Sequence, residues 1–203
     1  MRKLLSLDLS TSCTGYAIFD LDSEELLEYG AIKPKVPLLS KMKYPEGAYH
    51  RIVDMSTRIL EVIQIHEPEH IIIEEVNRGI NRIAQKSLDA LHFFVLDILY
   101  FIEPKWLKAV VWRDSNGRKG WRGMLGLQLS VADKEYNKTV RAFNKSAKRK
   151  KDKLKKQPVI DWKKLACVHV NNKYSLNFDA WKDAEHGDIV DAICVGESFF
   201  LDK

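Results

Sequence analysis

The chain has 203 residues, 45% of them hydrophobic, which is enough for one substantial core, so we expect a single domain over residues 1–203. Its three cysteines are far apart and form no CxxC pair, which suits a reduced protein in the cytoplasm better than a disulfide scaffold or a zinc finger. The net charge is +5, but residues 134–156 hold eleven Lys or Arg against two Asp or Glu. The basic character therefore belongs to one segment.

The apolar stretches of the chain do not predict a membrane segment. The N-terminal stretch is interrupted at Asp8, so we expect no signal peptide. The longest stretch, residues 90–102, is too short to cross a bilayer and contains His92 and Asp97. We interpret it as part of a buried helix or a subunit interface and expect no membrane partner.

In chain order, the apolar pattern predicts three strands, then alternating helices and strands, and finally two helices. Residues 70–76 form a continuous β-branched run, as expected of a strand buried on both faces. The predicted strands are residues 2–9, 15–20, 26–33, 70–76 and 108–113, and the predicted helices are residues 49–65, 81–103, 161–170 and 183–200. This order predicts an α/β fold with a mixed sheet, in which three antiparallel strands precede parallel ones and helices flank the sheet.

A lysine-rich segment, residues 116–157, interrupts this pattern before the last helices. It begins with an irregular Gly/Arg-rich stretch and continues as a predicted helix pair without an apolar face. A solvated surface or disorder without a partner would explain the charge, but lysines on all sides favour contact with a phosphate backbone. The candidate DNA contacts are Lys145, Lys148, Arg149, Lys150 and Lys151, together with Arg113, Arg118, Lys119 and Arg122.

The string "HEPEH", residues 66–70, matches the H-E-x-x-H motif of zinc proteases, but we reject this interpretation. The motif requires both histidines one turn apart on a helix. Pro68 lies between them, and the residue before a proline avoids helical geometry. His70 also belongs to a predicted strand.

A carboxylate, Asp8, lies within the apolar first strand "LLSLDL". A buried and unpaired carboxylate costs several kcal/mol or becomes protonated. Asp8 could simply cap the turn at residues 10–14, or it could bind a cation. Hydration or a raised pKa would relieve its cost without the cation.

Further carboxylates occur in two distant apolar segments. Glu74 and Glu75 end the central strand, while Asp188 and Asp191 share one face near the start of the last helix. The helix N-terminus alone would explain Asp188. Carboxylates in three separate segments, without His or Cys, instead indicate Mg²⁺ or Mn²⁺. A pair of such ions activates water at one metal and stabilises the leaving oxygen at the other.

These residues carry a resemblance to a known family. A first-strand Asp followed by "TGYAIF", then "IIIEEV", then D-x-x-D in the last helix resembles the RuvC-type Holliday junction resolvases. Residues 4–20, 70–76 and 186–196 match well, and residues 114–180 match poorly. The resemblance implies a ribonuclease H-like fold. It also implies that Asp8, Glu74, Asp188 and Asp191 are the catalytic, metal-binding acids, with Glu74 preferred over Glu75 by the family pattern.

The resemblance further implies a homodimer that resolves four-way DNA junctions by metal-dependent nicking of two like strands. The predicted helix over residues 81–103 carries more apolar residues than one sheet contact needs, so we expect it to form the dimer interface. The small, divergent form of the chain favours a phage gene, whose product would act in the host cytoplasm.

Other functions also fit parts of the pattern. The opening strands resemble those of sugar kinases and actin-like ATPases, but those proteins need two such domains. A non-catalytic DNA-binding protein, or a related nuclease acting on RNA or on flaps and forks, is also consistent with the sequence. RuvC-type enzymes commonly have an aromatic residue three positions after the strand Glu. Asn77 stands there, so either Arg78 or Ile80 replaces the ring as a wedge or junction selection is less strict.

Overall fold

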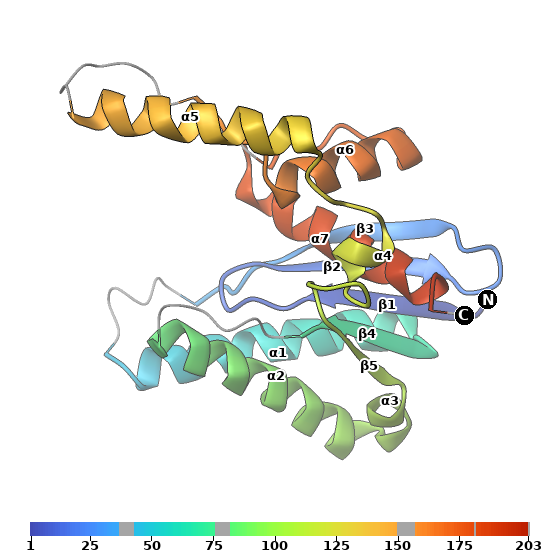
Figure 1. Ribbon diagram of the computed structural model, residues 1–203. Coiled ribbons are helices and arrows are strands. Elements are labelled where there is room, and N and C mark those ends of the chain that lie inside the picture. The colour runs from blue at the N-terminus through green and yellow to red at the C-terminus, as the bar shows by residue number, and fades with distance from the viewer. Residues whose placement is uncertain (37–42, 76–81, 150–156, 181, 203) are drawn as a thin grey trace.

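The computed structural model describes residues 1–36, 43–75, 82–149, 157–180 and 182–202. Within them, one five-stranded sheet has the order β3-β2-β1-β4-β5 (Figure 1). β1 pairs antiparallel with β2 and parallel with β4, while β2 and β3 are antiparallel and β4 and β5 are parallel. The strands are β1 (Lys3–Asp8), β2 (Thr14–Asp20), β3 (Leu26–Ile32), β4 (His70–Glu74) and β5 (Val110–Arg113). The predicted mixed α/β sheet is confirmed.

Helices cover both faces of the sheet (Figure 1). One face packs against α1 (Glu46–His66), α2 (Arg82–Ile102) and the short α3 (Pro104–Lys108). The other face packs against α7 (Ala184–Phe200), which in turn contacts α4 (Trp121–Met124) and α6 (Trp162–Tyr174). Helix α5 (Val131–Arg149) is the outermost layer on that side. None of the helices in the described ranges is long and apolar enough to cross a membrane.

The alternation of β1 divides the core into two parts. Leu5 and Leu7 pack with the α1 and α2 side, whereas Leu4 packs with the α7 side. Ser6 also faces α7, because its hydroxyl donates to the carbonyl of Ala192 over 2.6 Å. Because side chains alternate along a strand, residues of even number in β1 point toward α7.

Three local predictions were incomplete or wrong. The short helices α3 and α4 were not predicted; each buries one tryptophan, Trp106 or Trp121, at the sheet. The basic segment was predicted as a helix pair without an apolar face. In its described part the predicted pair is a single long helix, α5, which follows the short α4 and buries Val140 and Asn137. Asn137 exchanges two hydrogen bonds of 2.7 Å with the backbone of Ile160, so Ile160 lies against α5.

Candidate active site between the sheet and helix α7

Asp8 and Glu74 lie at the carboxyl ends of two neighbouring parallel strands. The register pairs Leu7 with Ile73, so the next residues of the two strands, Asp8 and Glu74, are neighbours. Side chains at every second position of a strand share a face. Asp8 is therefore on the same face of β1 as Leu4, and Glu74 on the same face of β4 as Ile72, and both Leu4 and Ile72 pack on the α7 side. The two carboxylates therefore face the same helix, and they share a hydrogen bond.

Strand geometry also separates Glu74 from its neighbour Glu75. The Glu74 side chain is buried, and Trp121 Nε1 donates to its Oε1 over 3.2 Å. Its backbone carbonyl lies 3.2 Å from His92 Nε2. Glu75 follows the end of β4, is exposed and lines a different cavity beside Trp112. Only Glu74 of this pair faces Asp8.

Helix α7 brings Asp188 and Asp191 over the same strand ends. Asp183 caps the helix by accepting from the backbone N–H of Glu185, which places Asp188 beyond the first turn. The helix dipole is therefore a weak explanation for Asp188. Gly15 permits the close contact of β2 with α7, because a Cβ at this position would lie 1.9 Å from the carbonyl oxygen of Asp188. Asp191 is 6% exposed, and its carboxylate is close enough to Glu74 of the sheet to be affected by that charge.

The four carboxylates influence one another electrostatically. Burial, followed by the negative charges of Glu74, Asp191 and Asp188, raises the pKa of Asp8 well above its usual range. Burial and the charge of Glu74 raise the pKa of Asp191 to about 7. Burial also raises the pKa of Asp188, although Lys163 and a hydrogen bond from Cys13 act in the opposite direction. The four acids therefore form one electrostatically coupled cluster, and the positive charges near them are too few to balance their negative charges.

The chemistry of this donor set fits a hard divalent cation. Carboxylate oxygens are the ligands that Mg²⁺ and Mn²⁺ prefer, and a cation would offset the repulsion that raises these pKa values. In the described ranges, no three His, Cys, Asp or Glu side chains are arranged so that they could together hold one ion. The donor type and charge fit a metal, whereas closer approach of the side chains would be needed for full coordination.

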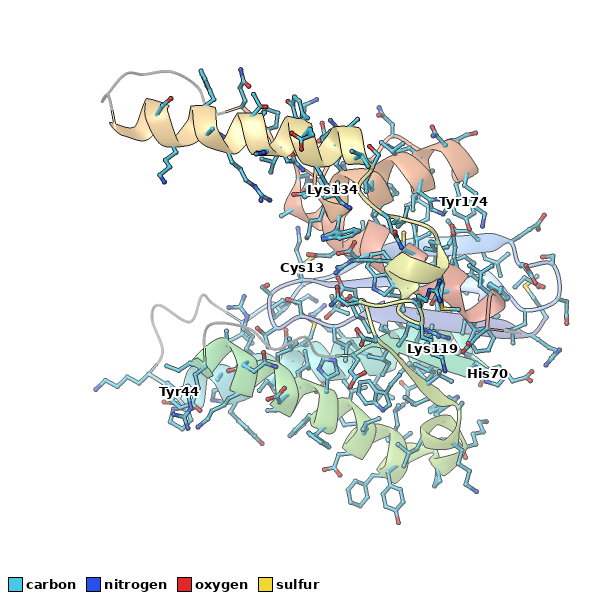
Figure 2. The ribbon with its side chains drawn as sticks, in the orientation of Figure 1. Cys13, Tyr44, His70, Lys119, Lys134 and Tyr174 are labelled. Carbon is cyan, nitrogen blue, oxygen red and sulfur yellow. The ribbon has the colours of Figure 1, made fainter. Side chains whose placement is uncertain are left out.

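Three neighbours of the carboxylates were not predicted. Trp121 contacts Glu74, Lys163 Nζ lies 3.8 Å from Asp188 Oδ1, and the Cys13 thiol donates to Asp188. Cys13 lies in the turn between β1 and β2, and it is labelled in Figure 2. Burial, together with the hydrogen bond to Asp188, raises its pKa to about 12, so it remains a thiol. Trp121 and Lys163 come from the part of the chain that matches no motif.

The predicted DNA contacts occupy different environments. Arg113 is buried and forms an ion pair of 2.7 Å with Asp202, so it is not on the surface. Arg118 and Lys119 are exposed, and Arg122 is partly buried against the ring of Trp121. Lys145 is exposed on α5, and the backbone of Lys148 and Arg149 forms the end of that helix. Asn77, Arg78, Lys150 and Lys151 lie outside the described residues.

Comparison with known structures shows where this fold occurs. The Thermus thermophilus RuvC structure has a TM-score of 0.57 and 13% identity over 98% of this chain and 93% of that chain. T. thermophilus RuvC in complex with a Holliday junction substrate has a TM-score of 0.52 and 14% identity over 99% and 94%. The yeast mitochondrial Holliday junction resolvase Ydc2 has a TM-score of 0.51 and 9% identity over 98% and 78%. No protein-family model and no curated protein sequence matches the chain. The chain therefore has the ribonuclease H-like fold of the Holliday junction resolvases.

Proposed function

We propose that this protein is a divalent-metal-dependent endonuclease that cuts branched DNA, with the four-way junction as its principal substrate. The observation that carries the proposal is the convergence of Asp8, Glu74, Asp188 and Asp191 from β1, β4 and α7. The shared fold with junction resolvases supports the choice of a branched substrate.

The residues around the carboxylates have distinct roles in this proposal. Asp8 and Glu74 on the rigid sheet, with Asp191 and Asp188 on α7, would hold one or two Mg²⁺ or Mn²⁺ ions. When bound, these ions supply an activated water and stabilise the leaving oxygen. Trp121 fixes the orientation of Glu74 through its indole N–H. Lys163, beside Asp188, places a positive charge where a phosphate diester can approach.

Cleavage of a mobile four-way junction tests this function. The purified chain is incubated with the junction in Mg²⁺, in Mn²⁺ and in chelator, and the products are compared with those from a fork, a three-way junction and an RNA duplex. We expect cleavage in the presence of metal only, with the four-way junction cut at least as fast as the others. Preferential cleavage of RNA would favour the alternative nuclease, and binding without any cleavage would favour a DNA-binding protein.

We also propose that the protein acts as a homodimer through α2. Leu91, Val95 and Leu99 of this helix are in the core, so they are not available to a partner. Phe93 and Phe101 are nevertheless 72% and 77% exposed, and Tyr100 and Ile102 beside them are also exposed. Apolar side chains exposed together on one helix are typical of an interaction surface.

The dimer prediction is tested by sedimentation at micromolar concentration. We expect the mass of two chains for the wild type and of one chain for the double variant Phe93→Glu, Phe101→Glu, because a buried charge opposes association. Val131→Glu is the control, since Val131 is 79% exposed on α5 at the opposite side of the sheet. A wild-type mass of one chain would contradict the prediction.

We propose a phosphate-binding surface along α5 and the loop before α4. It includes exposed Lys145, the end of α5 with Lys148 and Arg149, and exposed Arg118 and Lys119. Lys150, Lys151, Asn77 and Arg78 remain proposed contacts from outside the described residues. Arg113 is left out, because its ion pair with Asp202 gives it a structural role.

Neutralising Lys145, Lys148 and Arg149 together is expected to weaken binding to all DNA structures alike. The slope of log K against log salt should become less steep by roughly one unit for each lost phosphate contact. Titrations at several salt concentrations measure this slope. Lys105→Ala is the control, because Lys105 is exposed on α3 at the other face of the sheet. An unchanged slope in the triple variant would make the segment a solvated surface.

A further inference from the structure

A cavity of about 420 Å³ lies between the loop before α4, the start of α5 and the start of α6. We call it the α4–α6 pocket. Its lining includes three cationic side chains, Arg118, Arg122 and Lys134, and one aromatic ring, Trp162. Figure 2 labels Lys134 near the end of α5 that lies closer to α4. All of these residues belong to the part of the chain that resembles no family motif.

Two pairs of consecutive residues connect the pocket to the carboxylates. In the first pair, Trp121 donates to Glu74, while the next residue, Arg122, lines the pocket. In the second pair, Trp162 lines the pocket, while the next residue, Lys163, lies 3.8 Å from Asp188. On two separate elements, α4 and α6, a residue that lines the pocket is thus the chain neighbour of a residue that contacts a carboxylate.

The side chains of the pocket combine positive charge with an accessible ring. Trp162 is 38% exposed, and the guanidinium of Arg122 lies 5.9 Å from the centre of its ring. In the described ranges, Arg122 has one hydrogen-bond acceptor, Asn116 Oδ1, at the long distance of 3.5 Å. Donors of this guanidinium thus remain for an anionic ligand. A cationic pocket with a stacking surface is suited to a nucleotide, since phosphate and base are recognised together.

We propose that the α4–α6 pocket binds one unpaired nucleotide of the DNA strand whose neighbouring phosphate lies at the carboxylates. The base stacks on Trp162, and Arg118, Arg122 and Lys134 contact the phosphates. This inference rests on the proposed nuclease function for the position of the strand, but not for the binding itself. Trp162 of α6 would also provide an aromatic contact for the DNA, and the chain has no Phe, Tyr or Trp between Glu74 and Phe93 that could provide one.

The test measures binding of a fluorescein-labelled pentathymidylate by the full chain in chelator, where cleavage does not interfere. Fluorescence anisotropy gives the affinity, and a blunt 20-base-pair duplex is the reference ligand. We expect Trp162→Ala to weaken pentathymidylate binding about tenfold, because one stacking contact is lost. Trp162→Phe should retain most of the affinity, and the duplex should bind equally to all three proteins.

Trp112→Ala is the matched control, since Trp112 is 41% exposed on β5 and outside the pocket. Equal pentathymidylate affinity in wild type and Trp162→Ala would overturn the inference, as would an equal loss for pentathymidylate and duplex. The outcome is separable from that of the proposed function. Junction cleavage without a Trp162 effect rejects the pocket alone, whereas Trp162-dependent binding without any cleavage supports the pocket and rejects the nuclease.

Discussion

Asp8→Asn is expected to lower cleavage of a four-way junction by more than about 100-fold, while junction binding stays the same or tightens. The change removes a metal-ligand charge but little volume, so the fold should persist and repulsion of the phosphate should decrease. Residues that hydrogen-bond to a metal ligand without binding the metal usually change activity by about 10–100-fold when mutated, and the expected loss for Asp8→Asn is larger. Glu74→Gln and Asp191→Asn should behave alike, because all three acids meet at the same strand ends.

A stability measurement adds a readout that does not depend on cleavage. The pKa of Asp191 is raised to about 7 in the folded chain, against about 4 when unfolded. Between these two values the Asp191 carboxyl loses its proton first in the unfolded chain, so the contribution of Asp191 to the stability of the metal-free wild type falls as pH rises. Asp191→Asn lacks this carboxylate. We therefore expect the metal-free variant to gain stability relative to the wild type from about pH 4 to about pH 7, as measured by thermal unfolding.

Asp20→Asn is the matched control for both measurements. Asp20 is buried at the end of β2, and its Oδ1 accepts from the backbone N–H groups of Asp22 and Ser23, which lowers its pKa. The variant should therefore lose stability above the unfolded pKa and keep full cleavage. The assignment would be wrong if Asp8→Asn retained more than a few per cent of activity. A metal-free Asp191→Asn that gained no stability relative to the wild type between about pH 4 and about pH 7 would also contradict it.

Apart from α5, the strands and long helices were predictable because each has a periodic apolar pattern or a continuous apolar run. The run at residues 70–76 predicted the central strand, and β4 lies there between β1 and β5. The short helices were not predictable, since α3 and α4 have five and four residues and too few positions to show a period. Each depends on a buried tryptophan, Trp106 or Trp121, whose partners lie far away in the sequence.

The candidate site was predictable to a similar extent. Carboxylates at strand ends stand out among apolar neighbours, so Asp8 and Glu74 could be selected from the sequence. Trp121 and Lys163 could not, because their partners are far along the chain and no pattern marks them. Arg113 shows the opposite error. Its charge indicated DNA contact, but its ion pair with Asp202, 89 residues later, became visible only in the fold.

Gly15→Ala is expected to lower the free energy of unfolding by about 3 kcal/mol, or the melting temperature by about 10 °C. The added Cβ would lie 1.9 Å from the backbone oxygen of Asp188 and 3.0 Å from the nitrogen of Ile189, so α7 must move away from β2. Gly15 is also the register partner of Asp8. The displacement therefore separates the acids of α7 from those of the sheet, and a shift of about 1 Å at reacting groups can reduce a rate 100-fold.

Gly30→Ala distinguishes this close contact from a general effect of removing a glycine from the sheet. Gly30 lies on β3 opposite Tyr16, and the three atoms nearest to its added Cβ all belong to the Tyr16 side chain, the first of them 2.7 Å away. That ring is partly exposed and can rotate, whereas the backbone of α7 cannot move without repacking the core. An alanine in a strand is otherwise more favourable than glycine by roughly 0.5–1 kcal/mol. Gly30→Ala should therefore stay within about 1 kcal/mol of the wild type and retain cleavage. If Gly15→Ala has the same free energy of unfolding and the same cleavage rate as Gly30→Ala, the position of α7 does not require a glycine at position 15. The close packing of Asp188 on β2 is then not what positions the acids.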